Sequence, residues 1–138
     1  MSIPDSRKNI LVVEDAEPIR KMVCSMLVVN GYSVLEAADG AEALTIVRDC
    51  QSIHLVITDV IMPQMNGADL ARHLSREVPG LPIIFMSGYT EDPVVRSMEH
   101  VGSAFLAKPF TATALVEKVR QTLDDSWTDG RASRFGPQ

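Results

Sequence analysis

The most informative stretch of this chain is HLVITD at residues 54–59, an apolar run that ends in the carboxylate of Asp59. The loop that follows, VIMPQMNG at residues 60–67, contains a proline and a glycine. An apolar run of this kind is typical of a buried strand, and Pro and Gly mark the turn after it. Doubly wound α/β sheets bind their ligands outside the carboxyl ends of the strands. Asp59 is therefore the first candidate functional residue.

Apolar runs and helical patterns alternate along the whole chain. Strands are predicted at residues 10–13, 33–37, 53–58, 82–87 and 104–107. Helical spacing of apolar residues follows each strand, at residues 16–29, after Asp39, at residues 67–77, from Asp92 to about His100, and after Thr111. In the first helix the apolar positions are Ile19, Met22, Val23, Met26 and Leu27. Because the strands are apolar throughout, we expect a parallel sheet with helices on both faces, which is the α/β class.

Length and composition indicate a single soluble domain. The chain has 138 residues, of which 46% are hydrophobic and 22% are charged. At this length one domain is expected. We expect an N-terminal extension at residues 1–8, a folded domain at residues 9–124, and a flexible tail at residues 125–138, where the periodicity ends.

Charge and cysteine content narrow the expected compartment and partners. The net charge is −5 and the basic residues are dispersed, so we expect no nucleic-acid surface. No apolar stretch approaches the roughly 20 residues that cross a bilayer, and the N-terminus has no apolar signal segment. We therefore expect a cytoplasmic protein without membrane contact, in which Cys24 and Cys50 are reduced thiols.

Two other predicted strands also end in charged residues. Glu14 and Asp15 follow the first strand, and Lys108 follows the fifth. With Asp59 they bring three carboxylates to one sheet edge, where the carboxylates repel each other. A divalent cation relieves this repulsion, and Mg²⁺ suits a site of oxygen ligands that also receives a phosphoryl oxygen. Ser87, at the end of the fourth strand, adds a hydroxyl donor, and together these groups are the parts of a phosphoryl-transfer site.

The chain resembles the receiver domain of two-component response regulators over roughly residues 8 to 124. The resemblance rests on an ordered set of residues: Glu14-Asp15, Asp59, Ser87 and Lys108-Pro109. It implies a flavodoxin-like, doubly wound sheet of strand order 2-1-3-4-5 with five helices. It also implies that Asp59 is the phosphoacceptor, that Glu14 and Asp15 bind Mg²⁺ with it, and that Ser87 and Lys108 bind phosphoryl oxygens.

Further site features follow from the same resemblance. It implies that the backbone carbonyl of Ile61 is a metal ligand and that the peptide bond before Pro109 is cis. Many receivers have a switching Tyr three residues before the Lys, whereas this chain has Phe105, which offers no hydroxyl. Tyr89, two residues after Ser87, is our candidate for part of that role.

The first functional reading is a signalling module. A sensor histidine kinase or a histidine phosphotransfer protein would phosphorylate Asp59, and the surface of residues 92–100, 104–107 and the last helix would then regulate a separate partner. The same surface could form a homodimer. The chain would be a stand-alone regulator or the receiver segment of a hybrid histidine kinase, and not an enzyme beyond its own phosphorylation and dephosphorylation.

Two other readings stay open. The first is an aspartyl-phosphate hydrolase, but its usual signature needs an acid two residues after the nucleophile, and Ile61 cannot protonate a leaving group. The second is a binding module that signals without phosphorylation. Metal binding that depends on Asp15 and Asp59 separates this module from a phosphoacceptor.

Overall fold

The structure, a computed structural model, describes residues 7–50, 52–88 and 104–125. Within these ranges the elements are β1 (Asn9–Val13), α1 (Glu17–Val29), β2 (Ser33–Ala37), α2 (Gly40–Asp49), β3 (Leu55–Asp59), α3 (Gly67–Glu77), β4 (Ile83–Ser87), β5 (Ala104–Ala107) and α5 (Ala112–Asp125). The strands form one parallel sheet in the order β2-β1-β3-β4-β5, so the predicted α/β class and strand order are confirmed. The helix predicted from Asp92 to about His100 lies outside the described residues, as do Tyr89 and the tail from Ser126.

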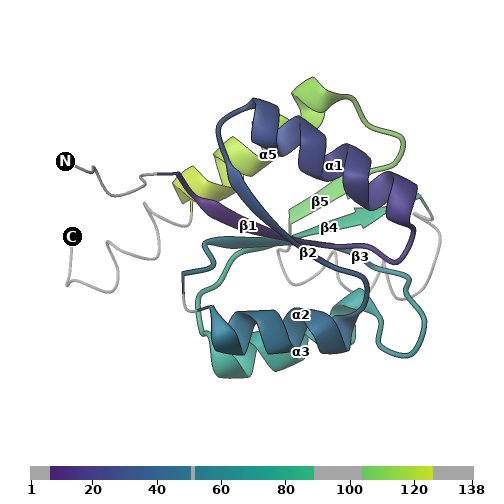
Figure 1. Ribbon diagram of the computed structural model, residues 1–138, viewed down its shortest axis with the longest axis vertical. Coiled ribbons are helices and arrows are strands. Elements are labelled where there is room, and N and C mark those ends of the chain that lie inside the picture. Colours follow the sequence, from purple (N-terminus) through teal and green to yellow (C-terminus); the bar gives the residue numbers. More distant parts are fainter. Residues whose placement is uncertain (1–6, 51, 89–103, 126–138) are drawn as a thin grey trace.

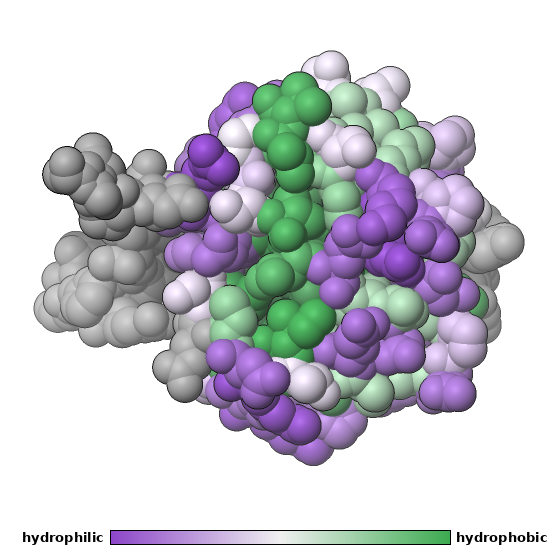
Figure 2. Space-filling model, in the orientation of Figure 1, coloured by the Kyte–Doolittle hydropathy of each residue, from purple (hydrophilic) through white to green (hydrophobic). Residues whose placement is uncertain are grey.

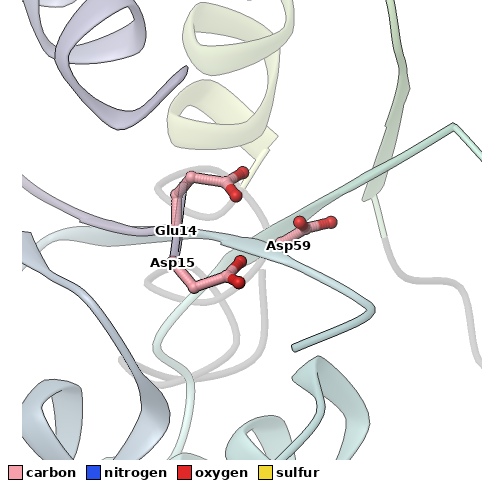
Figure 3. A group of neighbouring side chains, drawn as sticks. All are labelled: Glu14, Asp15 and Asp59. Carbon is pink, nitrogen blue, oxygen red and sulfur yellow. The ribbon is translucent and has the colours of Figure 1, made fainter. Parts of the chain in front are cut away.

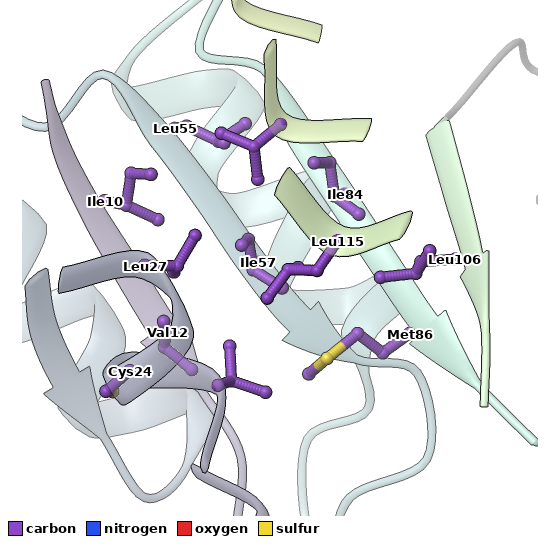
Figure 4. Close-up of a cluster of buried hydrophobic side chains, with 12 residues drawn as sticks. Ile10, Val12, Cys24, Leu27, Leu55, Ile57, Ile84, Met86, Leu106 and Leu115 are labelled. Carbon is purple, nitrogen blue, oxygen red and sulfur yellow. The ribbon is translucent and has the colours of Figure 1, made fainter. Parts of the chain in front are cut away.

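The sheet lies between two layers of helices (Figure 1). One face is covered by α1 and α5, and the other by α2 and α3. Successive strand residues point to opposite faces. Ile10 and Val12 therefore join the apolar cluster next to α1 and α5, which Figure 4 shows, whereas Leu11 and Val13 join the cluster next to α2 and α3. Burial on both faces explains why the strands are apolar throughout.

Side-chain caps begin three of the described helices. Asp39 accepts a hydrogen bond from a backbone N–H in the first turn of α2 at 2.8 Å, and Thr111 does the same for α5 at 3.0 Å, as predicted. Asn66, which the sequence analysis did not identify as a cap, accepts at 2.8 Å from the first turn of α3. Each cap satisfies an N–H group that the first helical turn leaves unpaired. The Asn66 cap begins α3 directly after the loop that leaves Asp59.

The third strand differs from its prediction. It spans Leu55–Asp59, whereas residues 53–58 were predicted. Just before it, the Nδ1 atom of His54 accepts the N–H of Asn9 at 2.9 Å, and the N–H of His54 donates to the carbonyl of Asn9 at 2.9 Å. Because an imidazole replaces a backbone carbonyl as acceptor, the regular ladder begins only after His54. At the other end Asp59 still pairs with β4, and so it belongs to the strand itself.

One apolar position of α1 points away from the core. Met22 is 43% exposed, whereas Val23 and Leu27 are fully buried. The buried side of α1 is centred on these two residues, and Met22 lies at its margin, about 100° around the helix from Val23.

Figure 2 shows a stripe of hydrophobic surface in the same view as Figure 1. The exposed large apolar side chains of the described residues are Met22, Val28, Val29, Leu35 and Ile61. The helices of the described part are too short or too polar to cross a bilayer.

Candidate functional site

The ends of β1 and β3 bring three carboxylates together (Figure 3). These strands are neighbours, with Val13 opposite Thr58, and so Glu14 follows β1 beside Asp59 at the end of β3. One ligand oxygen each from Glu14, Asp15 and Asp59 can be chosen so that all lie within 4.8 Å of one another. The structure therefore assembles the acidic cluster that the sequence predicted at this edge of the sheet.

The acidic cluster is buried on one side and exposed on the other. Glu14 is 1% exposed and Asp59 is 9% exposed, whereas Asp15 is exposed to solvent. The main chain holds Glu14 in place, because its N–H donates to the Ala37 carbonyl at 3.1 Å and its own carbonyl accepts from Arg20 at 2.9 Å. Asp15 leaves the cluster open to a ligand from solvent.

Lys108 joins two of the carboxylates from a distant part of the chain. Its ammonium Nζ lies 3.2 Å from an oxygen of Glu14 and 3.2 Å from an oxygen of Asp59. The residue follows β5, and its N–H donates to the Ser87 carbonyl at 3.0 Å. The peptide bond between Lys108 and Pro109 is cis. One ammonium therefore faces three carboxylates, and the cluster retains an excess of negative charge.

The electrostatics of the cluster reflect burial and crowding. Burial, and then the charge of Asp59, raise the pKa of Glu14 above its ordinary value. Burial acts to lower the pKa of Lys108, but the carboxylates of Asp59 and Glu14 outweigh it, so the Lys108 pKa lies above its ordinary value and the group stays an ammonium at neutral pH. The cluster thus favours the arrival of further positive charge.

The donor set fits a magnesium ion. Mg²⁺ takes oxygen ligands at about 2.1 Å, and so two ligand oxygens on opposite sides of the ion are about 4.2 Å apart. One carboxylate oxygen each of Glu14, Asp15 and Asp59 lies within 4.8 Å of the other two, so small side-chain rotations are enough to reach that distance. One exposed carboxylate leaves room for the several waters that Mg²⁺ keeps.

The remaining predicted site residues fall into separate places. Ser87 ends β4 at the same edge of the sheet and is buried. Ile61 follows the strand that carries Asp59 and is 39% exposed, and its carbonyl as a metal ligand stays a prediction. Phe105 packs on Phe85 with ring centroids 5.5 Å apart, in an apolar cluster. Tyr89 lies outside the described residues.

Gly67, at the start of α3, was not predicted as part of the site. Its N–H donates to the Val60 carbonyl at 2.7 Å. A β-carbon on Gly67 would lie 2.6 Å from the carbonyl oxygen of Asp59, closer than real β-carbons come. The glycine thus lets α3 approach the backbone of the candidate nucleophile. The sequence contained a weak signal for this role, namely a glycine at the end of the loop after Asp59.

Comparisons with known proteins agree with this geometry. A family model described as "Response regulator receiver domain" matches residues 10–120. Sensor kinase CckA of Brucella abortus is 38% identical over 118 residues, which are 84% of this chain and 12% of that protein. DNA-binding response regulator MtrA of Mycobacterium tuberculosis is 36% identical over 118 residues, which are 85% of this chain and 51% of that protein. This chain thus spans half of one of these relatives and a small part of the other.

A solved structure extends the similarity to three dimensions. The crystal structure of the receiver domain from the hybrid histidine kinase CckA matches with a TM-score of 0.71 and 39% identity, and the match covers 83% of this chain and 98% of that one. The family match covers Glu14, Asp15 and Asp59 as well as Ser87 and Lys108. Sequence, fold and site geometry agree that this chain belongs to the response regulator receiver domain family of two-component systems.

Proposed function

We propose that this chain accepts a phosphoryl group on Asp59, with Mg²⁺ bound beside it, and that phosphorylation changes a surface which regulates a partner protein. The donor would be a sensor histidine kinase or a histidine phosphotransfer protein. One observation carries the proposal: three carboxylates at the ends of β1 and β3 converge, and Lys108 bridges two of them. Receiver domains are signalling modules, and we propose no catalytic activity beyond this chain's own phosphorylation and dephosphorylation.

The proposed reaction is a phosphoryl transfer to a carboxylate. One oxygen of Asp59 attacks the phosphorus of the donor's phosphohistidine, a P–O bond forms, and the P–N bond to the donor breaks. Glu14, Asp15 and Asp59, together with the carbonyl of Ile61, would hold the Mg²⁺, which neutralises charge on the phosphoryl oxygens when bound. Lys108 would exchange its contact with Asp59 for a phosphoryl oxygen.

The proposed switch depends on contacts that exist in only one state. Ser87 and Lys108 would bind phosphoryl oxygens only when Asp59 is phosphorylated, and this difference in contacts would shift the conformational equilibrium. The surface that responds would comprise residues 92–100, β5 and α5, as predicted from the family resemblance. Phe105 of β5 would respond through its packing on Phe85, since it has no hydroxyl, and Tyr89 is our candidate for the polar contact.

The setting of this module is also a proposal. Both cysteines are free thiols, as predicted, which supports a reducing compartment such as the cytoplasm. The similarity to a receiver of a hybrid histidine kinase supports a donor of that class, and this chain would be a stand-alone regulator or the receiver segment of such a kinase. A homodimer through the responding surface is a further prediction.

The proposal is tested by incubation with acetyl phosphate in the presence and absence of Mg²⁺. We expect a single retarded band on phosphate-affinity gels. EDTA in the incubation should prevent this band by removing Mg²⁺, and hydroxylamine should abolish it afterwards, because hydroxylamine cleaves acyl phosphates. Asp15→Asn is the matched control, since it keeps the Asp59 nucleophile but loses a metal ligand, and it should be labelled more slowly. Many turnovers of a generic phosphate ester per protein would instead indicate a hydrolase. No label on a folded protein that binds Mg²⁺ would leave two readings, namely strict dependence on a protein donor or signalling without phosphate.

A further inference from the structure

A second concave surface lies on α3, apart from the acidic cluster. It is a groove of approximately 320 Å³ beside α3 and the loop that precedes this helix. The groove is lined by residues of the loop end and of α3: Gln64, Met65, Asp69, Arg72, His73 and Arg76. None of these side chains has a role in the proposed phosphoryl transfer, and so the groove needs an explanation of its own.

The groove faces solvent because the other sides of α3 are packed. Leu70 and Leu74 are fully buried in the apolar cluster next to α2 and α3. Ala68 and Ala71 pack against a smaller cluster that contains Phe85. The helical period therefore leaves the groove residues on the remaining, outward side of α3.

The groove carries an excess of positive charge. Arg72 pairs with Asp69, three residues earlier on α3. Glu77, at the end of α3, accepts two hydrogen bonds from Arg48 of α2, at 2.9 Å and 2.6 Å. Arg72 and Arg48 thus offset the two nearby carboxylates, and no carboxylate of the described residues forms an ion pair with Arg76, so the net excess is the charge of Arg76. Arg72 uses one guanidinium nitrogen for Asp69 and keeps N–H donors on its other nitrogens. This face is locally cationic in a chain whose net charge is −5.

The loop side of the groove has a defined shape. Met65 lies over Gly40, the first residue of α2, where a β-carbon would come within 2.5 Å of the Met65 sulfur. The N–H of Met65 donates to the Pro63 carbonyl at 2.7 Å, and Gln64 between them has a left-handed φ of 71°. The thioether of Met65 and the guanidinium groups line the same groove, and so the groove offers both charge and apolar contact.

We propose that this groove binds an acidic segment of a partner protein. Arg72 and Arg76 are four residues apart, which is about one helical turn and about 6 Å along α3. Carboxylates at alternate positions of an extended segment are spaced at about 6.6 Å, and a guanidinium binds a carboxylate through two parallel hydrogen bonds. Asp69 inside the groove repels a single compact anion at Arg72, whereas an extended segment reaches Arg76 as well and contacts Met65.

The test measures binding of a fluorescein-labelled peptide of alternating Glu and Ala residues by fluorescence anisotropy at physiological ionic strength. The Arg72→Ala/Arg76→Ala double variant should bind about tenfold or more weakly, because it loses two charge-assisted contacts. Arg120→Ala is the matched control. Arg120 is an exposed arginine of α5 that also pairs with a carboxylate three residues earlier, Glu117, at 3.0 Å, but it does not line the groove. This control should bind the peptide as the wild type does.

A second variant probes the groove without a change of charge. Gly40→Ala should displace the Met65 side chain and weaken peptide binding, while the thermal unfolding midpoint stays close to that of the wild type.

Absence of binding to the wild type, or an equal loss in the Arg120→Ala control, would overturn the proposal. Full competition by millimolar inorganic phosphate would also overturn it, because the groove would then be a site for small anions. Phosphorylation of the double variant by acetyl phosphate should be unchanged, and so failure here is distinguishable from failure of the phosphoacceptor proposal.

Discussion

Replacement of Gly67 by alanine tests how closely α3 approaches the phosphoacceptor strand. The added β-carbon would lie 2.6 Å from the carbonyl oxygen of Asp59 and 3.0 Å from the Cα atom of Val60. Both are backbone atoms, which cannot rotate away. The substitution must therefore move α3 away from β3 or displace the backbone that carries the Asp59 carboxylate.

The magnitude follows from two opposing effects. Alanine in place of glycine favours a helix by at most about 1 kcal/mol, and overpacking in a close-packed site costs about 1–3 kcal/mol. We expect the free energy of unfolding to fall by about 1–2 kcal/mol in Gly67→Ala, since the gain is small at the first helical residue. Phosphorylation by acetyl phosphate should slow as well, because a displacement of about 1 Å in a reacting group can cost about a hundredfold in rate.

Gly40→Ala is the matched control for this prediction. Gly40 is likewise the first residue of its helix, and a β-carbon there would lie 2.5 Å from an atom, but that atom is the flexible Met65 sulfur. We expect its unfolding free energy to stay within about 0.5 kcal/mol of the wild type. Urea unfolding followed by circular dichroism measures both variants, and the midpoint of Gly67→Ala should fall by about 1 M. Equal midpoints for the two variants would refute the argument from the Asp59 backbone.

Three further outcomes are expected from the electrostatics. Asp59→Asn should raise the thermal unfolding midpoint at pH 7 in EDTA. Burial and the Asp59 charge raise the pKa of Glu14, a raised carboxyl pKa costs stability at pH values above it, and the substitution removes the Asp59 charge. An unchanged or lower midpoint would contradict this. Burial lowers the pKa of His54, so the unfolded chain binds the proton more readily and stability falls as the pH drops below about 6.5. Urea midpoints at pH 7.5 and 5.5 should therefore differ more for the wild type than for His54→Gln, and equal differences would oppose the reasoning. Burial raises the pKa of the Cys24 thiol to about 11. A thiol reagent at pH 8 should therefore label only Cys50 in the native protein and both cysteines in denaturant. Rapid labelling of both cysteines in the native protein would contradict this prediction.

Local signals predicted most of the fold. β2, α3 and β5 have the bounds that periodicity and turn residues indicated, and Asp39 and Thr111 cap their helices as expected. The prediction failed where tertiary contacts decide the outcome. β3 begins two residues late because the His54 side chain takes over a ladder hydrogen bond, and Met22 is exposed although its spacing matches the buried side of α1.

The candidate site likewise has features that the sequence predicted and features that only tertiary contacts decide. The sequence predicted that Glu14, Asp15, Asp59 and Lys108 meet at one edge of the sheet, because the carboxyl ends of parallel strands share an edge. It did not predict that Lys108 bridges Glu14 and Asp59, since side-chain geometry across 94 sequence positions decides that contact. The close approach of Gly67 also depends on how α3 packs, which spacing alone does not determine.

The most direct measurement locates the phosphoryl group itself. The protein is incubated with acetyl phosphate and Mg²⁺, the acyl phosphate is reduced with borohydride to the alcohol, and tandem mass spectrometry of the peptides identifies the modified residue. We expect homoserine at position 59 and no product in Asp59→Asn. Homoserine in place of a different aspartate, or a label of the same yield in Asp59→Asn, would contradict the assignment of Asp59 as the phosphoacceptor.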